Sequence, residues 1–199
     1  MKALNSTPAR RKAGGLTDNI KTFVYAILIA LAIRTVAFEP FNIPSGSMIP
    51  TLLVGDYLFV SKYSYGYSRY SLPLGLPLIP GRILVTPPKR GDVAVFKYPP
   101  DNKTDYIKRI IGLPGDTVEI VDGTVLVNGQ NLDEPYVPPE YRDHVSIAKE
   151  VVPKDHYFVL GDHRSSSNDS RVWGFVDRKE IYGKAVFVYW PPDKIGRVR

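Results

Sequence analysis

The sequence contains no cysteine among its 199 residues. Disulfides, thiolate catalysis and cysteine-based zinc sites are therefore excluded. Histidine is also scarce, because only His144, His156 and His163 are present, and no two of them have the spacing of a ligand pair such as H-x-x-x-H. We therefore expect neither a bound metal nor another cofactor.

The sequence also lacks a large excess of one charge over most of its length. The net charge is +6, but residues 1–21 contain five Lys and Arg residues and only Asp18, so the remainder carries about +2. A nucleic-acid-binding domain would concentrate its positive charge on a folded face. We therefore expect no nucleic-acid partner, and the basic N-terminal residues are typical of the cytoplasmic flank of a membrane anchor.

Long apolar runs are absent except for one near the N-terminus. Residues 22–33 read TFVYAILIALAI without a charge, and Arg34 then interrupts the run. A spanning helix needs roughly 17 to 25 mostly apolar residues. Residues 22–38 are therefore predicted to be a transmembrane anchor in which Arg34 extends its side chain to the far interface.

Two other interpretations of this run remain open. It resembles a cleaved signal peptide, with Ala30-Leu31-Ala32 as a small-x-small cleavage site, and it is also compatible with a buried core helix. The anchor interpretation makes residues 1–21 a cytoplasmic basic tail. It leaves residues 39–199 on the other side of the membrane as one domain.

After residue 38 the pattern changes to short strands separated by turn residues. Apolar runs of strand length cover residues 57–60, 93–96, 105–111, 157–160 and 181–190. Residues 117–127 predict a hairpin with a type I′ turn at Asp122-Gly123. Repeated prolines exclude a central strand or helix from residues 64–90 and predict a loop or extended ribbon there. We expect an all-β fold of antiparallel strands, with residues 131–150 forming a polar surface region.

Two residues of this domain have candidate catalytic side chains. Ser47 lies in the turn sequence PSGSMIP, and Lys108 lies inside the apolar run DYIKRII. Strand alternation places Lys108 on one face with Tyr106 and Ile110, opposite Arg109. If that face is buried, the pKa of the lysine falls and its neutral amine can take the proton of a serine. The alternative is a solvated or salt-bridged lysine and an ordinary turn serine.

A polar loop offers a competing arrangement. Residues 161–171 read GDHRSSSNDSR, which contains His163 and Asp169. These two side chains and Ser47 would suffice for a serine-histidine-aspartate triad. The loop is also compatible with a solvated surface segment, so the triad and the Ser-Lys pair remain alternatives at this point.

Five sequence blocks occur in the order found in one protein family. They are PSGSMIPTL, GDYLFVSKYSYG, KRGDVAVFKYP, DYIKRIIGLPGD and GDHRSSSNDSRVWGFV. In these blocks the chain resembles bacterial type I signal peptidases, the membrane-bound serine proteases with a Ser-Lys dyad that remove signal peptides from exported proteins. The resemblance implies an antiparallel β catalytic core, an inserted β lobe at residues 113–156 and one N-terminal transmembrane helix.

The resemblance also implies a role for each matching residue. Ser47 would be the nucleophile and Lys108 the general base, while Ser45 would help to bind the oxyanion beside the Ser47 N–H. Supporting residues would be Ser167, which would orient the lysine, and the charged pairs Asp169 with Arg171 and Asp162 with Arg109. Shallow pockets for small substrate residues would be lined by Phe41, Ile43, Met48, Leu52, Val95, Tyr106 and Ile107.

Some features depart from the family pattern. His163, Ser165 and Ser166 stand where members often have Asn, Asp and Asn. The single predicted anchor replaces the two anchors found in some members, and the inserted lobe at residues 113–156 is short.

The resemblance implies a monomeric, single-pass protein of the bacterial cytoplasmic (inner) membrane, with its N-terminus in the cytoplasm and its catalytic domain on the periplasmic side.

The expected partners are the lipid bilayer and exported preproteins, which would be cleaved after Ala-x-Ala sites. Two alternatives are a related Ser-Lys processing protease, such as one that matures pilins, and a non-catalytic membrane-tethered β binding module.

Overall fold

The computed structural model describes residues 15–36, 38–67, 83 and 85–199. The chain divides into two compact units, of which the first ends at Arg34 and the second extends from Thr35 to Arg199. The helix α1 (Leu16–Val36) accounts for the described part of the first unit. The second unit is composed mainly of antiparallel strands, as the sequence predicts.

Helix α1 contains the apolar run, but its bounds differ from the predicted range 22–38. It begins at Leu16, with Asp18 in its first turn, and it ends before Phe38, which begins strand β1 (Phe38–Asn42). The apolar side chains of residues 20–29 in this helix are exposed, including Phe23 at 69% and Ile29 at 59%. Within the residues that the structure describes, no helix is both long enough and apolar enough to cross a membrane.

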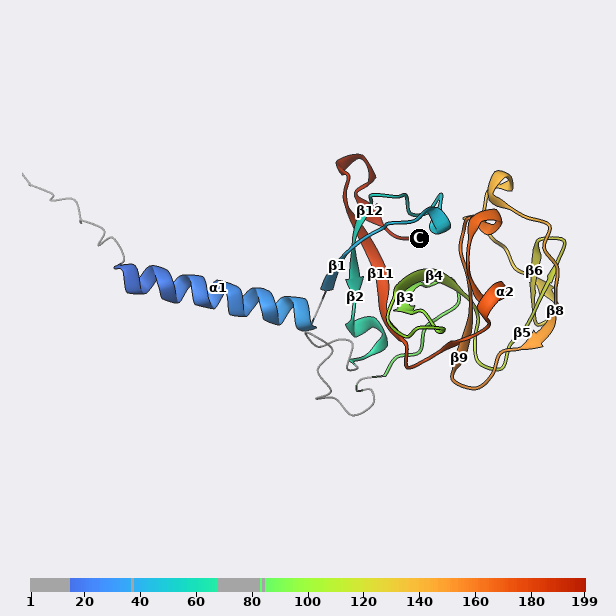
Figure 1. Cartoon of the computed structure of the whole chain (residues 1–199), viewed down its shortest axis with the longest axis horizontal. Helices are drawn as coiled ribbons and strands as arrows, with labels where there is room; N and C mark the ends of the chain where they lie inside the picture. Colours follow the sequence, from blue (N-terminus) through green and yellow to red (C-terminus); the bar gives the residue numbers. More distant parts are fainter. Residues whose placement is uncertain (1–14, 37, 68–82, 84) are drawn as a thin grey trace, which may run out of the picture. The chain divides into compact units, whose positions relative to one another are not determined.

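The larger sheet of the second unit has eight antiparallel strands (Figure 1). Its main path runs in the order β1-β2-β11-β3-β4-β9-β10, and β12 pairs with β11. The strands not yet given are β2 (Tyr57–Ser61), β3 (Val93–Lys97), β4 (Asp105–Gly112), β9 (His156–Leu160), β10 (Val176–Asp177), β11 (Ile181–Trp190) and β12 (Gly196–Arg197). All five apolar runs singled out in the sequence are strands of this sheet.

A second sheet of four strands has the order β7-β6-β5-β8. It consists of β5 (Thr117–Val121), β6 (Thr124–Val127), β7 (Gln130–Asn131) and β8 (Ile147–Val151), all within the range 113–156. The predicted type I′ hairpin joins β5 and β6, since Asp122 and Gly123 both have positive φ, at 46° and 77°. The turn residues thus set the register of this hairpin.

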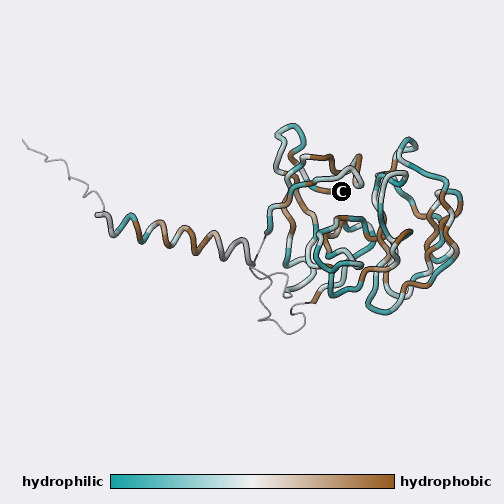
Figure 2. Tube along the Cα trace, viewed as in Figure 1, coloured by the Kyte–Doolittle hydropathy of each residue, from teal (hydrophilic) through white to brown (hydrophobic). Residues whose placement is uncertain are grey.

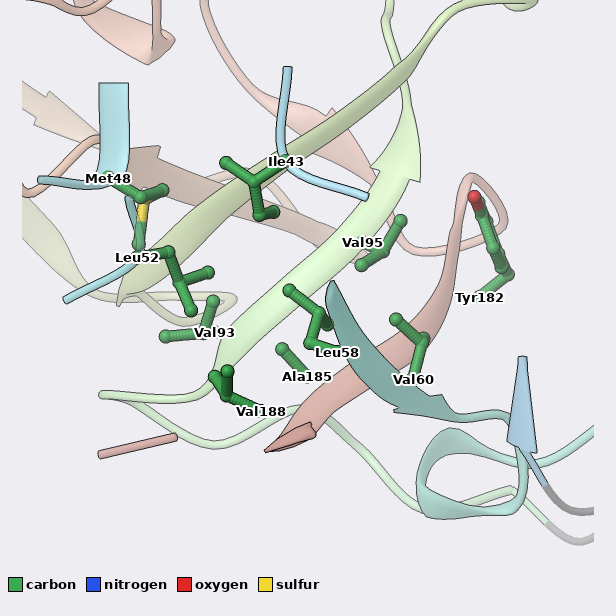
Figure 3. Close-up of a cluster of buried hydrophobic side chains, with 10 residues drawn as sticks. All are labelled: Ile43, Met48, Leu52, Leu58, Val60, Val93, Val95, Tyr182, Ala185 and Val188. Carbon is green, nitrogen blue, oxygen red and sulfur yellow. The ribbon is translucent and has the colours of Figure 1, made fainter. Parts of the chain in front are cut away.

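Buried apolar side chains from several strands form the core of the second unit. Figure 3 shows one cluster, in which strand residues such as Val60, Val93 and Val95 meet Met48 and Leu52 from the segment after β1. Two further clusters lie around Phe96 and Phe158. Figure 2 shows the corresponding apolar stretches along the strands of both sheets.

Several short elements were not predicted from the sequence, and three of them illustrate how weak their patterns are. β1 contains Pro40 and occupies the edge of the large sheet, where a missing N–H is tolerated. β8 is largely exposed and has no alternation of apolar and polar residues. The one-turn helix α2 (Ser170–Trp173) is shorter than any sequence periodicity can indicate.

The predicted ribbon at residues 64–90 lies largely outside the described residues, because 68–82 and 84 are not described. In the described part, the short helix η2 (Tyr63–Tyr65) precedes an isolated bridge between Tyr67 and Ile83.

Candidate active site

Ser47 and Lys108 meet although 61 residues separate them in the chain. Ser47 lies in the short helix η1 (Gly46–Met48), and Lys108 lies in β4 between β3 and β9. The Nζ atom of Lys108 donates a hydrogen bond to Oγ of Ser47 over 2.6 Å. Both side chains are buried, Lys108 with 4% and Ser47 with 9% exposure. Lys108 therefore lies on a buried face of its strand, which is the condition for its action as a base.

The surroundings of Lys108 favour its neutral form. Burial lowers the pKa of Lys108 to about 8, although the carboxylates of Asp169 and Asp162 act in the opposite direction. The amine also donates to the carbonyl of Ile107 and lies 5.3 Å from the ring centroid of Tyr106. With such a pKa roughly one molecule in ten has a neutral lysine at pH 7, compared with one in a few thousand for an unperturbed lysine. The Ser-Lys pair is thus equipped for general-base catalysis.

A cavity of about 410 Å³ lies beside this pair. Ser45, an exposed residue that precedes η1, is in its lining together with Ser47 and Lys108. The remaining lining residues are Pro44, Gly46, Thr104, Asp105, Tyr106, Ile107, Ser166 and Asn168. A peptide carbonyl seated here would be next to a hydroxyl nucleophile, its base and a second hydroxyl.

Arg109, the residue after Lys108 in β4, forms a buried ion pair with Asp162. Nε and Nη2 of Arg109 donate to the two carboxylate oxygens of Asp162 at 2.9 and 2.6 Å. Thr51 donates to the same carboxylate, and Arg109 also donates to the carbonyl of Gly91. The guanidinium and carboxylate are almost completely buried, at 2% and 1% exposure. The expected pairing is therefore present, and its charges have polar partners as burial requires.

Asp169 and Arg171 form a second pair at the start of α2. The carboxylate of Asp169 accepts from Nε and Nη2 of Arg171 at 2.8 and 2.9 Å. It also accepts from the backbone N–H of Arg171 and of Gly161. Asp169 thus caps the helix and connects it to the end of β9.

Ser167 is close to the nucleophile but makes no lysine-orienting hydrogen bond. Its Oγ is buried and has no hydrogen-bond partner among the described residues. A Cβ atom added to Gly161 would lie 2.2 Å from this Oγ and 2.5 Å from the carbonyl oxygen of Ser47. Only glycine fits at residue 161, and the loop therefore packs directly on the main chain of Ser47.

The histidine triad considered above is not formed. Nδ1 of His163 lies 3.3 Å from the carbonyl oxygen of Gly46, and the ring of His163 contacts Tyr141 edge-on. Asp169, its proposed partner, is bonded to Arg171 instead. The backbone N–H of His163 donates to the carbonyl of Ser47 at 3.1 Å, so this residue supports the nucleophile through its main chain.

The predicted substrate-binding residues fall into two groups. Tyr106 and Ile107 line the cavity, whereas Phe41 packs on the core shown in Figure 3. The other four are not in the cavity lining, because they are buried in that core with at most 2% exposure: Ile43, Met48, Leu52 and Val95. Their apolar character serves packing, which a sequence cannot separate from pocket lining.

Sequence reasoning missed several residues around the site. Thr104, Ser166 and Asn168 line the cavity, and Glu134 and Asp143 contact arginines of the loop 161–171. Ser166 and Asn168 belong to a recognised block and Thr104 directly precedes one, so their position in the sequence could have indicated them. Glu134 and Asp143 lie in a stretch without periodicity and gave none. In the described part of the chain, no group of three or more His, Asp or Glu side chains is arranged to hold a metal ion.

Comparisons with known proteins identify the family of this chain. Residues 16–190 match the family model described as signal peptidase, peptidase S26. Signal peptidase I of Leptolyngbya laminosa is 41% identical, with 92% of this chain and 84% of that protein covered. Signal peptidase I of Rickettsia canadensis is 37% identical, with 85% and 78% covered.

A crystal structure of a signal peptidase I from Enterococcus faecalis is 36% identical. The match covers 50% of this chain and 97% of the chain in that structure, with a TM-score of 0.45. The match of the family model over most of the chain, and the identity with the two relatives, establish the family. The chain therefore belongs to the signal peptidase family, peptidase S26, and is a serine protease.

Proposed function

We propose that this protein removes N-terminal signal peptides from exported preproteins, with Ser47 as nucleophile and Lys108 as general base. The observation that carries the proposal is the 2.6 Å contact between Nζ of Lys108 and Oγ of Ser47 beside a cavity. The names of the relatives, signal peptidase I, support the substrate class. A binding module would have no need for a buried lysine whose pKa is lowered to about 8.

The reaction is acyl transfer in two steps. Neutral Lys108 takes the proton of Ser47, whose Oγ bonds to the scissile carbonyl carbon and forms a tetrahedral oxyanion. The N–H of Ser47 and the hydroxyl of Ser45 are proposed to bind that oxyanion. A donor of this kind contributes about 3 kcal/mol to transition-state stabilisation. The intermediate collapses when the lysine ammonium gives its proton to the leaving amine, and the mature protein departs.

Water completes the cycle. The regenerated neutral amine of Lys108 takes a proton from a water molecule, and the hydroxide attacks the acyl carbon. Collapse of the second intermediate breaks the bond to Oγ, which recovers its proton from the lysine. The signal peptide leaves with a free carboxylate, and Ser47 and Lys108 return to their starting states.

We further propose that the N-terminal segment holds the catalytic domain at the outer, periplasmic face of the bacterial cytoplasmic membrane as a single-pass anchor. The uncharged run at residues 22–33 and the exposed apolar side chains of α1, such as Phe23, Leu28 and Ile29, support this proposal. The basic residues that precede α1 favour a cytoplasmic N-terminus. The protein is proposed to act as a monomer, because each chain contributes both residues of the dyad.

One experiment tests substrate and location together. Membranes from cells that express the full chain are washed with carbonate and incubated with a preprotein that carries an Ala-x-Ala site. We expect activity in the washed membranes and a mature product whose new N-terminus follows the second alanine, as read by mass spectrometry. A preprotein with Leu at −1 and −3 is the control. Equal cleavage of both would contradict the proposed selectivity, and activity only in the wash would contradict the anchor.

The pH dependence of cleavage should report Lys108. Only the neutral amine accepts a proton, so kcat/KM should rise about ten-fold per pH unit and level off above the lysine pKa of about 8. The measurement is kcat/KM for a peptide substrate from pH 6 upward. A His163→Asn variant is the control and should keep the same limb. A limb near pH 6.5 that disappears in this variant would assign the base to His163 instead.

A further inference from the structure

A segment outside the motif blocks contacts the loop 161–171 at several points. This segment, residues 134–143, follows β7 and includes the short helix η5 (Pro139–Tyr141); we call it the bridging segment. The sequence suggests only a polar surface region there. Its side chains nevertheless reach Arg109 of β4 and three residues of the loop 161–171.

The first contact joins Glu134 to Arg164. Nη1 of Arg164 donates to Oε2 of Glu134 at 2.9 Å, and Nη2 donates to Oε1, so the pair is bidentate. The hydroxyl of Tyr136 donates to the same carboxylate at 3.0 Å. Both charged side chains are buried, Arg164 at 3% and Glu134 at 9% exposure. On its other side Arg164 donates from Nε to the carbonyl of Gly161.

The second contact joins Asp143 to Arg171. Nη1 of Arg171 donates to Asp143, while Nε and Nη2 of the same guanidinium hold Asp169. Nη2 also donates to the carbonyl of Arg164 at 2.8 Å. Asp143 and Arg171 are 14% and 7% exposed. Arg171 is therefore held between the bridging segment and the carboxylate that caps α2.

A third contact involves an aromatic ring. The guanidinium carbon of Arg109 lies 3.9 Å from the ring centroid of Tyr136, which is a cation–π geometry. Arg109 is at the same time bonded to Asp162. Each of these three arginines thus contacts both the loop 161–171 and the bridging segment.

The loop 161–171 in turn packs on the main chain of Ser47. The N–H of His163 donates to the carbonyl of Ser47, and Gly161 leaves no room between the loop and that carbonyl. A displacement of the loop would therefore displace the nucleophile relative to Lys108. Catalysis is sensitive to such shifts, since a misplacement of about 1 Å can lower a rate about 100-fold.

From these contacts we propose that the bridging segment is a positioning element of the active site, in which Glu134 and Asp143 hold the loop 161–171 against Ser47. This inference rests on the proposed function for its kinetic consequence. It goes beyond it in assigning a role to residues that belong to none of the motif blocks. Glu134 and Asp143 touch no reacting atom and act through Arg164 and Arg171.

The test uses Glu134→Gln and Asp143→Asn in the full chain, with Glu140→Gln as the matched control because Glu140 is exposed on the same segment. Amide exchange is measured by mass spectrometry, and kcat and KM are measured with an Ala-x-Ala peptide. We expect exchange in residues 161–171 to become at least about ten-fold faster in both variants and unchanged in the control. We expect kcat to fall about ten-fold while KM changes less than about two-fold, as for a misplaced nucleophile.

The readouts separate the two proposals. If the parent does not cleave the peptide, the proposed function fails, but the exchange rates still decide whether the segment holds the loop. Unchanged exchange and kcat in both folded variants would overturn the inference. If Glu134→Gln does not fold, Asp143→Asn decides, because Arg171 keeps its bonds to Asp169. Failure of both to fold would also overturn it, since the segment would then serve the fold rather than the position of Ser47.

Discussion

Replacement of Ser47 with alanine should abolish peptide cleavage, and replacement of Lys108 with methionine should lower kcat by about 10³-fold or more. Loss of the hydroxyl removes the acyl acceptor, and loss of the amine removes the base that lies 2.6 Å from it. Methionine fills much of the volume of the lysine without its proton-accepting nitrogen. Initial rates with an Ala-x-Ala peptide at pH 8.5, detected by product mass, measure both losses.

The control for this prediction is Lys149→Met, which removes an exposed lysine from β8 and should retain parental activity. Thermal unfolding of each variant establishes that it is folded. Because nucleophile and base act as a unit, the double variant should be hardly slower than the single ones. Substantial cleavage by folded Ser47→Ala or Lys108→Met protein would rule out the dyad.

Replacement of Arg109 with methionine should lower the free energy of unfolding by about 3 to 5 kcal/mol. The substitution leaves the carboxylate of Asp162, which is wholly buried, without its bidentate partner. Urea unfolding followed by circular dichroism gives the free-energy difference at an unchanged m-value.

Two comparisons test the origin of that loss. An Arg109→Met/Asp162→Asn double variant removes both charges and should be more stable than the sum of the single changes predicts. Lys179→Met breaks the ion pair with Asp177, in which Lys179 is 72% exposed, and should change stability by less than about 1 kcal/mol. Equal losses at Arg109 and Lys179 would contradict an effect of burial.

The strands of the large sheet were predictable because each combines a buried face with turn residues at its ends. The segment Asp105–Gly112 is the clearest case, since its apolar run ends at a glycine-proline turn. The β5–β6 hairpin was predictable from Asp122 and Gly123, which adopt the positive φ that a type I′ turn requires. β1 and β8 were not, because edge strands with exposed faces lack periodic burial.

The site was predictable in its main residues but not in its supports. Ser47, Lys108 and the two Asp-Arg pairs all follow from recognisable blocks. Ile43 and Val95 were assigned to a substrate pocket, but both are buried in the core. The assignment arose because apolar side chains that pack in a core and those that line a pocket look alike in a sequence. The contacts of Glu134 and Asp143 join distant segments and leave no local signal.

The chemical groups available to this protein were evident from its amino-acid sequence, which has no cysteine and no ligand-spaced histidine pair, and which places a serine in a turn and a lysine inside an apolar strand. Local periodicity and turn chemistry were enough for most strands, since both act between neighbouring residues. The choice between Lys108 and His163 as the partner of the Ser47 hydroxyl could be read only from the fold. That choice depends on burial and on a contact across 61 residues, which packing of η1 against β4 creates.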